Sequence, residues 1–368
     1  MAVWPVIQVT EKLQMIQGHG GNIYQIAKVL GCSPSEILDM SSNVCPLGMP
    51  GALKGVLDEK WDEIVSLPEV DSDGLRAGFA ASVGLSPNHV IAGNGTTEFI
   101  YTIPPALEVK RALIVGPTYS DYADACRAYG IEPLFYLAPE TRGFQPDLDE
   151  ISSMLGHADT VFICNPNNPT GRLMPAKSLI RLIESHPGVR FVIDESYLPF
   201  IPDWKTESLI DSEAGNIVVL HSFSKIFAVP GLRLGFLIAG PRIIHAFQPF
   251  KQPWSVNRPA QVAGTFLASQ KEFVDHVAGF VEKERKAFIG YLQGLDLVAP
   301  FSSAINFILF RLNGTLKAND LFSLMCDHRI LIRNCSNFPG LSDRFIRIAL
   351  KSPAANRTCA ELIRSVLY

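Results

Sequence analysis

The stretch HSFSKIFAVPGLRLGF, residues 221–236, directly follows an apolar, strand-like run, NIVVL (216–220). It contains a single lysine, Lys225, which stands among hydroxyl residues, glycines and one arginine. A lone lysine at a strand end is usually a surface ammonium. Hydroxyls and a guanidinium, however, bind a phosphate well, and a lysine amine bonds to an aldehyde. The residues around Lys225 therefore predict a site for a cofactor that carries both a phosphate and an aldehyde. The residues concerned are Ser222, Ser224, Lys225, Gly231, Arg233 and Gly235.

Short apolar runs rich in β-branched residues recur from about residue 88 onward, and helix-like segments separate them. This alternation predicts an α/β fold with a mostly parallel sheet buried on both faces. Ligands of such sheets bind beyond the carboxyl ends of the strands, where polar signatures follow most of these runs. The predicted strands lie within HVIAGNG (89–95), RALIVGPTY (111–119), DTVFICNPNNPTG (159–171), RFVIDESY (190–197), NIVVLHSFSK (216–225) and RLGFLIAG (233–240).

Asp194 ends another of the predicted buried strands, in VIDESY (192–197). Burial of a carboxylate without a cationic or hydrogen-bonding partner is unfavourable. A protonated pyridine nitrogen would be such a partner, and the pair would keep the ring able to accept electrons. Asp194 and Lys225 together therefore indicate a cofactor with a pyridine ring.

Composition narrows the classes of function. The 368 residues are 47% hydrophobic, with 32 basic and 36 acidic side chains and a net charge of −4. No run of like charge marks a nucleic-acid or membrane surface, and no apolar stretch approaches the ~20 residues of a membrane span. The seven cysteines show no CxxC pair and no metal-ligand spacing, which favours free thiols, a cytoplasmic location and no metal site. The absence of GxGxxG after the first strand disfavours a nicotinamide dehydrogenase.

The regular alternation of strand-like and helix-like segments ends after KQPWSVNRPA (251–260). A long charged helical stretch (269–295) precedes the strand-like AINFILFRL (304–312), a helix-like segment and the strand-like FIRIAL (345–350), a pattern typical of a smaller α+β domain. We therefore predict an N-terminal segment, 1–45, that packs with the small domain; a large cofactor-binding domain, 46–255; and a C-terminal small domain, 256–368.

The motifs GNGTTE, NPNNPTG, DESY and SFSK(x7)R, in this order, resemble the fold type I pyridoxal-phosphate enzymes of the aspartate aminotransferase superfamily, class I and II. The resemblance covers nearly the whole chain. It implies the PLP-dependent transferase-like fold, pyridoxal 5'-phosphate as cofactor, and a homodimer. A non-catalytic sensor on the same fold would carry an appended DNA-binding segment, which we do not expect here.

The resemblance also implies roles by position. Lys225 is the lysine that bonds the cofactor aldehyde and later carries a proton, and Asp194 pairs with the pyridine nitrogen. Asn168 and Tyr197 bond the ring's 3-oxygen, and Tyr119 stacks on the ring. Lys225, Asp194 and Tyr197 are thus the implied catalytic residues. The residues implied to hold the cofactor phosphate, together with the helix that begins near Thr96, are Gly95, Thr96, Ser222, Ser224 and Arg233.

Two arginines, Arg333 in ILIRNCSNFPGL (330–341) and Arg347 in RFIRIAL (344–350), interrupt apolar runs. An exposed position on a strand face would explain each of them separately. By resemblance, Arg347 binds the substrate carboxylate, for which a guanidinium fork is well shaped, and Arg333 binds a substrate phosphate. The expected substrate is therefore a small phosphorylated amino compound.

Four further motifs, HGGN, SxNxxPLG, PWSVN and LIRxCxNxPGL, resemble the threonine-phosphate decarboxylase family, which makes aminopropanol phosphate for cobalamin assembly. Decarboxylation of L-threonine O-3-phosphate is the expected reaction, and a histidinol-phosphate-type aminotransferase that uses 2-oxoglutarate is the alternative. The two glycines between His19 and Asn22 allow a backbone to approach an anion, although the motif also fits a turn with a helix cap. The residues implied near the substrate phosphate, some of them across a dimer interface, are His19, Asn22, Asn43 and Arg333.

Three positions depart from these patterns. Leu67 stands where both families usually carry a tyrosine, so a hydroxyl from the partner subunit to the cofactor phosphate is expected to be missing. Tyr119 and Tyr197 stand where phenylalanines are expected in the decarboxylase, and in this they resemble the aminotransferase. We favour decarboxylation because of the N-terminal motif, although residue types alone do not set which Cα bond stands perpendicular to the cofactor ring.

Overall fold

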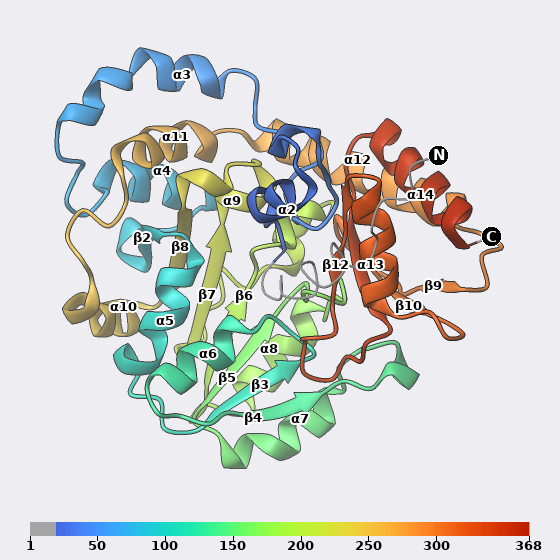
Figure 1. Ribbon diagram of the computed structural model, residues 1–368. Coiled ribbons are helices and arrows are strands. Elements are labelled where there is room, and N and C mark those ends of the chain that lie inside the picture. Colours follow the sequence, from blue (N-terminus) through green and yellow to red (C-terminus); the bar gives the residue numbers. More distant parts are fainter. Residues whose placement is uncertain (1–19, 368) are drawn as a thin grey trace.

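The computed structural model describes residues 20–367 and is built around a seven-stranded sheet (Figure 1). The strand order is β2 (Val90–Asn94), β8 (Leu234–Ala239), β7 (Ile217–Ser222), β6 (Arg190–Asp194), β5 (Thr160–Cys164), β3 (Ala112–Gly116) and β4 (Leu134–Leu137). All neighbours pair in parallel except β8, which is antiparallel to both β2 and β7. The predicted α/β fold with a mostly parallel sheet is confirmed.

Burial explains which strands could be predicted from the sequence. Every residue of β3, β5 and β7 is buried, as expected for strands covered on both faces. All six predicted strands are present in this sheet. The edge strand β4 was not predicted, because it is only four residues long and three of these residues are not buried.

Helices connect the strands and cover the sheet. In α8 the buried residues Ala176, Leu179, Leu182 and Ile183 recur at helical spacing and form one apolar stripe. The helices of this region are α4 (Asp73–Val83), α5 (Thr96–Ala106), α6 (Asp121–Ala128), α7 (Leu148–Met154), α8 (Ala176–Glu184), α9 (Phe223–Ile226) and α10 (Pro241–Phe247).

A second, antiparallel sheet lies to the right of the first in Figure 1. Its strands, in order, are β12 (Arg333–Asn334), β13 (Phe345–Ala349), β10 (Phe307–Leu312) and β9 (Val298–Pro300). It is accompanied by α12 (Lys271–Tyr291), α13 (Ala318–Asp327) and α14 (Pro353–Leu367). In α12, Val274, Val277, Val281 and Phe288 form the buried stripe, and the helix packs along α14.

The N-terminal part of the described chain joins this second region. Helix α2 (Ile23–Leu30) begins at Asn22, whose side chain accepts a hydrogen bond from the Gln25 amide. Strand β1 (Leu38–Asp39) then pairs in parallel with β11 (Ile330–Leu331). The segment that follows contains α3 (Leu53–Glu59), which packs against α11 (Arg258–Ala268).

The domain boundaries at residues 45 and 255 stay a prediction. Helix α11 (Arg258–Ala268), which begins just after the second boundary, packs on α3 and α4 rather than on the second sheet. Buried apolar residues of both sheets belong to one continuous core. Within residues 20–367, no helix is both long and apolar enough to cross a membrane.

Candidate active site

A cavity of about 200 Å³ lies where strands of the large sheet end. Its lining brings together residues from most of the motifs that were singled out in the sequence, although none from PWSVN. The predicted site residues in its lining are Asn43, Gly95, Thr96, Tyr119, Asn168, Asp194, Tyr197, Ser222, Ser224, Lys225, Arg233, Arg333 and Arg347. Asn22 is not among them, because it is exposed and caps α2. His19 lies outside the described residues, so its role stays a prediction.

Lys225 lies on the first turn after β7, in the short helix α9. Its burial, reinforced by the positive charges of Arg347 and Arg233, lowers the pKa of its amine to about 8. The backbone of this turn is fixed from the other side of the cavity, because the Lys225 carbonyl accepts a 2.8 Å hydrogen bond from the Cys45 amide. A buried amine that is partly neutral near pH 7 can act as a nucleophile and as a proton carrier.

Asp194 ends β6 and is held by two donors. The Tyr122 hydroxyl donates to Oδ2 at 2.7 Å, and the Ser196 amide donates to Oδ1 at 2.9 Å. Tyr122 was not among the predicted site residues. Its signal was its position three residues after Tyr119, at the start of α6. The two rings lie edge to face with centroids 5.8 Å apart.

An anion site is formed where α5 begins. Gly95, with a φ of +78°, precedes the helix, and no side chain caps this end. A Cβ at Gly95 would come within 2.6 Å of Arg233 Nη2, and a Cβ at Gly235 would come within 2.5 Å of the Thr96 amide. Both positions therefore require glycine for close approach, which leaves the helix amides and the guanidinium side by side as donors to a phosphate.

Arg347 lies on β13 and is almost fully buried, with 4% of its surface exposed. Its Nη1 donates to Asn168 Oδ1, and its Nη2 donates to the Ser41 carbonyl at 2.7 Å. Its Nε is buried without a partner among the described residues. The guanidinium is thus fixed in place while donor capacity remains for a ligand.

Arg333 faces Arg347 across the pair of strands β12 and β13, where the two are register partners. Its guanidinium donates to the Asn334 carbonyl and, at 2.8 Å, to Asn337 Oδ1, and it lies 5.1 Å from the ring centre of Phe338. Burial, with a contribution from Arg347, lowers the pKa of Arg333 to about 10. Like charges in directly opposite positions are destabilising, so this pair is arranged for anions.

The segment from Asp39 to Asn43 supports the substrate side of the cavity. Asp39 Oδ1 accepts hydrogen bonds from the Ser41 amide and hydroxyl and from the Ser42 amide. The Ser42 carbonyl accepts one from Lys351 Nζ at 3.0 Å. Asn43 Nδ2 reaches the Tyr197 hydroxyl at 3.3 Å. Asn43 and Tyr197 were predicted, whereas Asp39, Ser41, Ser42 and Lys351 were missed, because nothing in the local sequence predicts their contacts.

The residues present fit pyridoxal phosphate. The glycine-lined start of α5 suits a phosphate, the buried Lys225 amine suits an aldehyde, and the doubly held Asp194 carboxylate suits a ring N–H. Three polar atoms of cavity-lining residues are also buried without partners, as expected of groups that await a ligand. They are Asn43 Oδ1, Ser196 Oγ and Arg347 Nε.

Comparison with known proteins agrees with this geometry. The profile of the family "Aminotransferase class I and II" matches residues 35–366. A threonine-phosphate decarboxylase from Salmonella typhimurium is 34% identical over 353 residues, which is 95% of this chain and 96% of that protein. A bifunctional adenosylcobalamin biosynthesis protein from Leptospira interrogans is 31% identical over 95% of this chain, and this chain spans 41% of its length.

Two solved structures of related enzymes also have the same fold as this chain. An L-threonine-O-3-phosphate decarboxylase from Porphyromonas gingivalis has a TM-score of 0.81 at 32% identity, over 90% of this chain and 99% of that one. A histidinol-phosphate aminotransferase from Clostridium acetobutylicum has a TM-score of 0.84 at 27% identity, over the same 90% and 99%. The fold alone therefore does not separate the two activities.

Proposed function

We propose that this chain, which belongs to the aminotransferase class I and II family, is a pyridoxal-phosphate-dependent lyase that removes CO2 from a phosphorylated amino acid. L-Threonine O-3-phosphate is the substrate we favour, because two relatives, at 34% and 30% identity over 95% of this chain, carry the name threonine-phosphate decarboxylase. A third, at 31%, is named as a bifunctional adenosylcobalamin biosynthesis protein. The overall reaction converts threonine phosphate and one proton to aminopropanol phosphate and CO2.

The observation that carries the proposal is the charge of the cavity. Its lining residues include four cations, Lys225, Arg233, Arg333 and Arg347, and one carboxylate, Asp194. Arg233 faces the predicted cofactor phosphate, and Asp194 faces the predicted ring nitrogen. Arg333 and Arg347 then remain without anions, on opposite register positions of two strands. A substrate with one phosphate and one carboxylate would neutralise both.

The bound cofactor would supply an aldehyde for the substrate amine and a ring that accepts the electron pair of a broken Cα bond. The residues of the chain would orient the substrate and move the proton. Arg347 would hold the carboxylate in one orientation, since Asn168 and Ser41 fix its guanidinium. Arg333 would anchor the phosphate at the other end, so that two points define the tilt of the substrate.

Lys225 would move the proton. Its amine would hold the cofactor aldehyde in the absence of substrate, and at a pKa of about 8 the free amine can hold and return a proton near neutral pH. After CO2 leaves, Lys225 Nζ would deliver this proton to Cα. Asp194, fixed by Tyr122 and Ser196, would keep the ring nitrogen protonated during the reaction.

A histidinol-phosphate aminotransferase is the second candidate. Tyr119 and Tyr197, expected from the resemblance to be phenylalanines in a decarboxylase, favour it. Histidinol phosphate has no carboxylate, however, so Arg347 would have an anionic partner only when the second substrate is bound. Relatives of this type in the comparison also have lower identity, such as 26% over 90% of this chain for one from Ruminiclostridium cellulolyticum.

Product analysis with and without a keto acid separates the two candidates. Purified holoenzyme is incubated with threonine phosphate alone, and CO2 and aminopropanol phosphate are quantified. A decarboxylase forms both without 2-oxoglutarate. If threonine phosphate gives no CO2, while histidinol phosphate and 2-oxoglutarate yield glutamate, the second candidate replaces the first.

We also propose that the protein is a homodimer through the apolar strip, residues 61–70. Within it, Trp61, Ile64, Val65, Leu67 and Val70 are each at least half exposed, up to 88% for Val65. Contiguous exposed apolar side chains of this size are typical of an interaction surface. A second copy of the chain would cover them, and it would bring Leu67, rather than a hydroxyl, toward the partner's cofactor phosphate.

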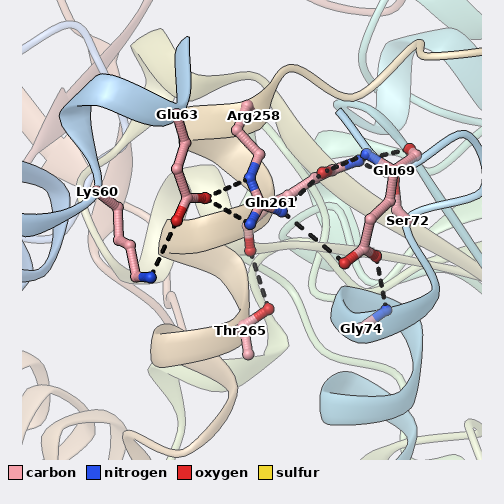
Figure 2. A network of polar contacts seen from close by, with 8 residues as sticks. All are labelled: Lys60, Glu63, Glu69, Ser72, Gly74, Arg258, Gln261 and Thr265. Carbon is pink, nitrogen blue, oxygen red and sulfur yellow. Dashed lines mark hydrogen bonds and ion pairs between the residues drawn. The ribbon is translucent and has the colours of Figure 1, made fainter. Parts of the chain in front are cut away.

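Polar contacts hold this strip in place although it has no core of its own. In Figure 2, Arg258 on α11 bonds Glu63 in the helical turn η2 (Trp61–Val65), with Nη2 and Oε2 2.6 Å apart. Gln261, one turn further, accepts from the Glu69 amide at 3.0 Å and donates to the Glu69 carbonyl at 2.8 Å. The apolar side chains are therefore presented outward in a fixed geometry, as a preformed interface requires.

The seven cysteines are all free thiols, in agreement with the proposed cytoplasmic location, where thiols stay reduced.

A further inference from the structure

A second cavity, which we call the aromatic cavity, lies behind the strand that leads to Lys225. Its volume is about 330 Å³, larger than that of the candidate active site. It is enclosed by α4, α9, α11, the start of α12 and the turn η7 (Trp204–Glu207). Its aromatic lining residues are Phe79, Trp204, His221, Phe223 and Phe227. A volume of this size is at the lower end of the range for small-molecule sites, ~300–1,000 Å³.

His221 is the polar group of this aromatic wall. Its side chain is buried, with 3% exposed, and its Nδ1 has no hydrogen-bond partner among the described residues. The rings of Phe79 and Trp204 stand 5.4 and 5.5 Å away, and burial lowers the pKa of the imidazole to about 4. The imidazole is therefore neutral at pH 7. A buried ring nitrogen without a partner is unfavourable unless a ligand or water satisfies it.

The charges of this cavity differ from those of the candidate active site. Its lining residues include two lysines, Lys205 and Lys271, and two aspartates, Asp203 and Asp275. Lys205 is already engaged, since its Nζ donates to the Ser82 carbonyl at 2.9 Å and lies 5.8 Å from the Trp204 ring centre. The lining thus carries no net charge and does not select an anion or a cation.

We propose that the aromatic cavity binds a small, uncharged, planar aromatic molecule that carries a hydrogen-bonding group for His221. The flat rings of Trp204 and Phe223 provide stacking surfaces, and the imidazole fixes the ligand's orientation. An engineered apolar cavity of ~150 Å³ holds benzene, so about 330 Å³ accommodates a ligand of two fused rings. This inference does not rest on the identity of the substrate.

The position of the cavity couples it to the cofactor site. His221 and Phe223 line the aromatic cavity, whereas Ser222 and Ser224, which alternate with them, line the candidate active site. His221 and Ser222 end β7, and Phe223 and Ser224 begin α9, so a ligand that shifts the first pair also shifts the second through the backbone they share. By linkage, the ligand and the cofactor then change each other's affinity by the same factor.

Indazole is a suitable probe, because its two fused rings carry both a donor and an acceptor and so match either tautomer of His221. Its binding to the holoenzyme is measured by titration calorimetry for wild type and three variants. Ala268→Phe fills the cavity from α11, and His221→Phe keeps a ring but removes both nitrogens. Ala81→Phe, on an exposed part of α4, is the matched control. Circular dichroism verifies that each variant is folded.

We expect one saturable site per chain, loss of binding in Ala268→Phe, roughly fivefold weaker binding in His221→Phe, as for one neutral hydrogen bond, and wild-type binding in Ala81→Phe. Absence of saturable binding to wild type, or equal binding to Ala268→Phe, overturns the site. Should Ala268→Phe not fold, undiminished binding to His221→Phe overturns it. Equal indazole affinity with and without cofactor overturns the coupling alone.

Discussion

Replacement of Arg333 by alanine should weaken catalysis through the substrate phosphate and leave the cofactor in place. Within residues 20–367, Arg333 is held by neutral partners, the Asn334 carbonyl, Asn337 Oδ1 and the face of Phe338. None of these partners is a carboxylate, so they leave the charge of Arg333 without a counter-ion. The variant would remove the charge-assisted hydrogen bonds to the phosphate while it also relieves the repulsion with Arg347 across the strand pair.

The magnitude follows from the type of bond that is lost. A hydrogen bond to a charged group contributes about 1.5–3 kcal/mol, and each ~1.4 kcal/mol is a tenfold change in kcat/KM. We therefore expect Arg333→Ala to lower kcat/KM for threonine phosphate by about 10- to 100-fold. The fold and the cofactor absorbance should not change, because the side chain lies at the substrate end of the cavity and away from the start of α5.

The assay compares threonine phosphate with threonine in wild type, Arg333→Ala and a control, Arg344→Ala. Arg344 is an exposed arginine of the same region, directly before β13. Wild type should strongly prefer the phosphorylated compound, and Arg333→Ala should lose most of that preference while Arg344→Ala keeps it. Equal losses for both substrates in Arg333→Ala would refute the reasoning and make Arg333 a structural or cofactor-linked residue.

The remaining predictions concern the cofactor and the assembly. Borohydride reduction should attach the cofactor covalently to wild type but not to Lys225→Ala, and mass spectrometry that finds the label in this variant would contradict the role of Lys225. Asp194→Asn should load cofactor yet lose most turnover, and Tyr122→Phe should show a smaller loss with a shifted cofactor absorbance, because one of two donors to the carboxylate is removed; unchanged turnover in Asp194→Asn would reject the pairing. Attachment of the cofactor to the apoprotein requires a neutral amine, so its rate should rise with pH and level off above about 8, where Lys225 loses its proton. A rise centred near 10.4, the pKa of a free lysine, would contradict the lowered pKa of Lys225. Light scattering should find a dimer for wild type and a smaller species for Val65→Asp, whereas a fully active wild-type monomer would exclude the proposed interface.

The sequence was most informative where burial and chemistry coincide. Five of the six predicted strands are buried runs that end in polar motifs, and the parallel topology brings those ends together. The sixth, β8, is antiparallel, so its start, next to Arg233, lies at this edge. Lys225, Asp194 and the residues at the start of α5 could therefore be placed in one cavity from their positions alone. The edge strand β4 escaped prediction because its apolar run, LFYL, is only four residues long and is mostly not buried.

Contacts that depend on tertiary packing were not predictable. Nothing local shows that Tyr122 reaches Asp194, 72 residues away, or that the carbonyls of Ser41 and Ser42 receive Arg347 and Lys351. The aromatic cavity likewise arises between elements that are remote in sequence. Asn22 is an example of a role that local sequence does predict. Its motif also fits a turn with a helix cap, and in the structure Asn22 is the cap of α2.

The central claim is that the bond between Cα and the carboxylate breaks, and it is tested most directly with carboxyl-13C threonine phosphate in D2O. Purified holoenzyme is given this substrate alone, without a keto acid. We predict one 13CO2 for each aminopropanol phosphate formed, with one deuterium at the former Cα and no deuterium in the recovered substrate. Recovered threonine phosphate that is deuterated at Cα, without release of 13CO2, would show that the Cα–H bond breaks instead and would contradict the account.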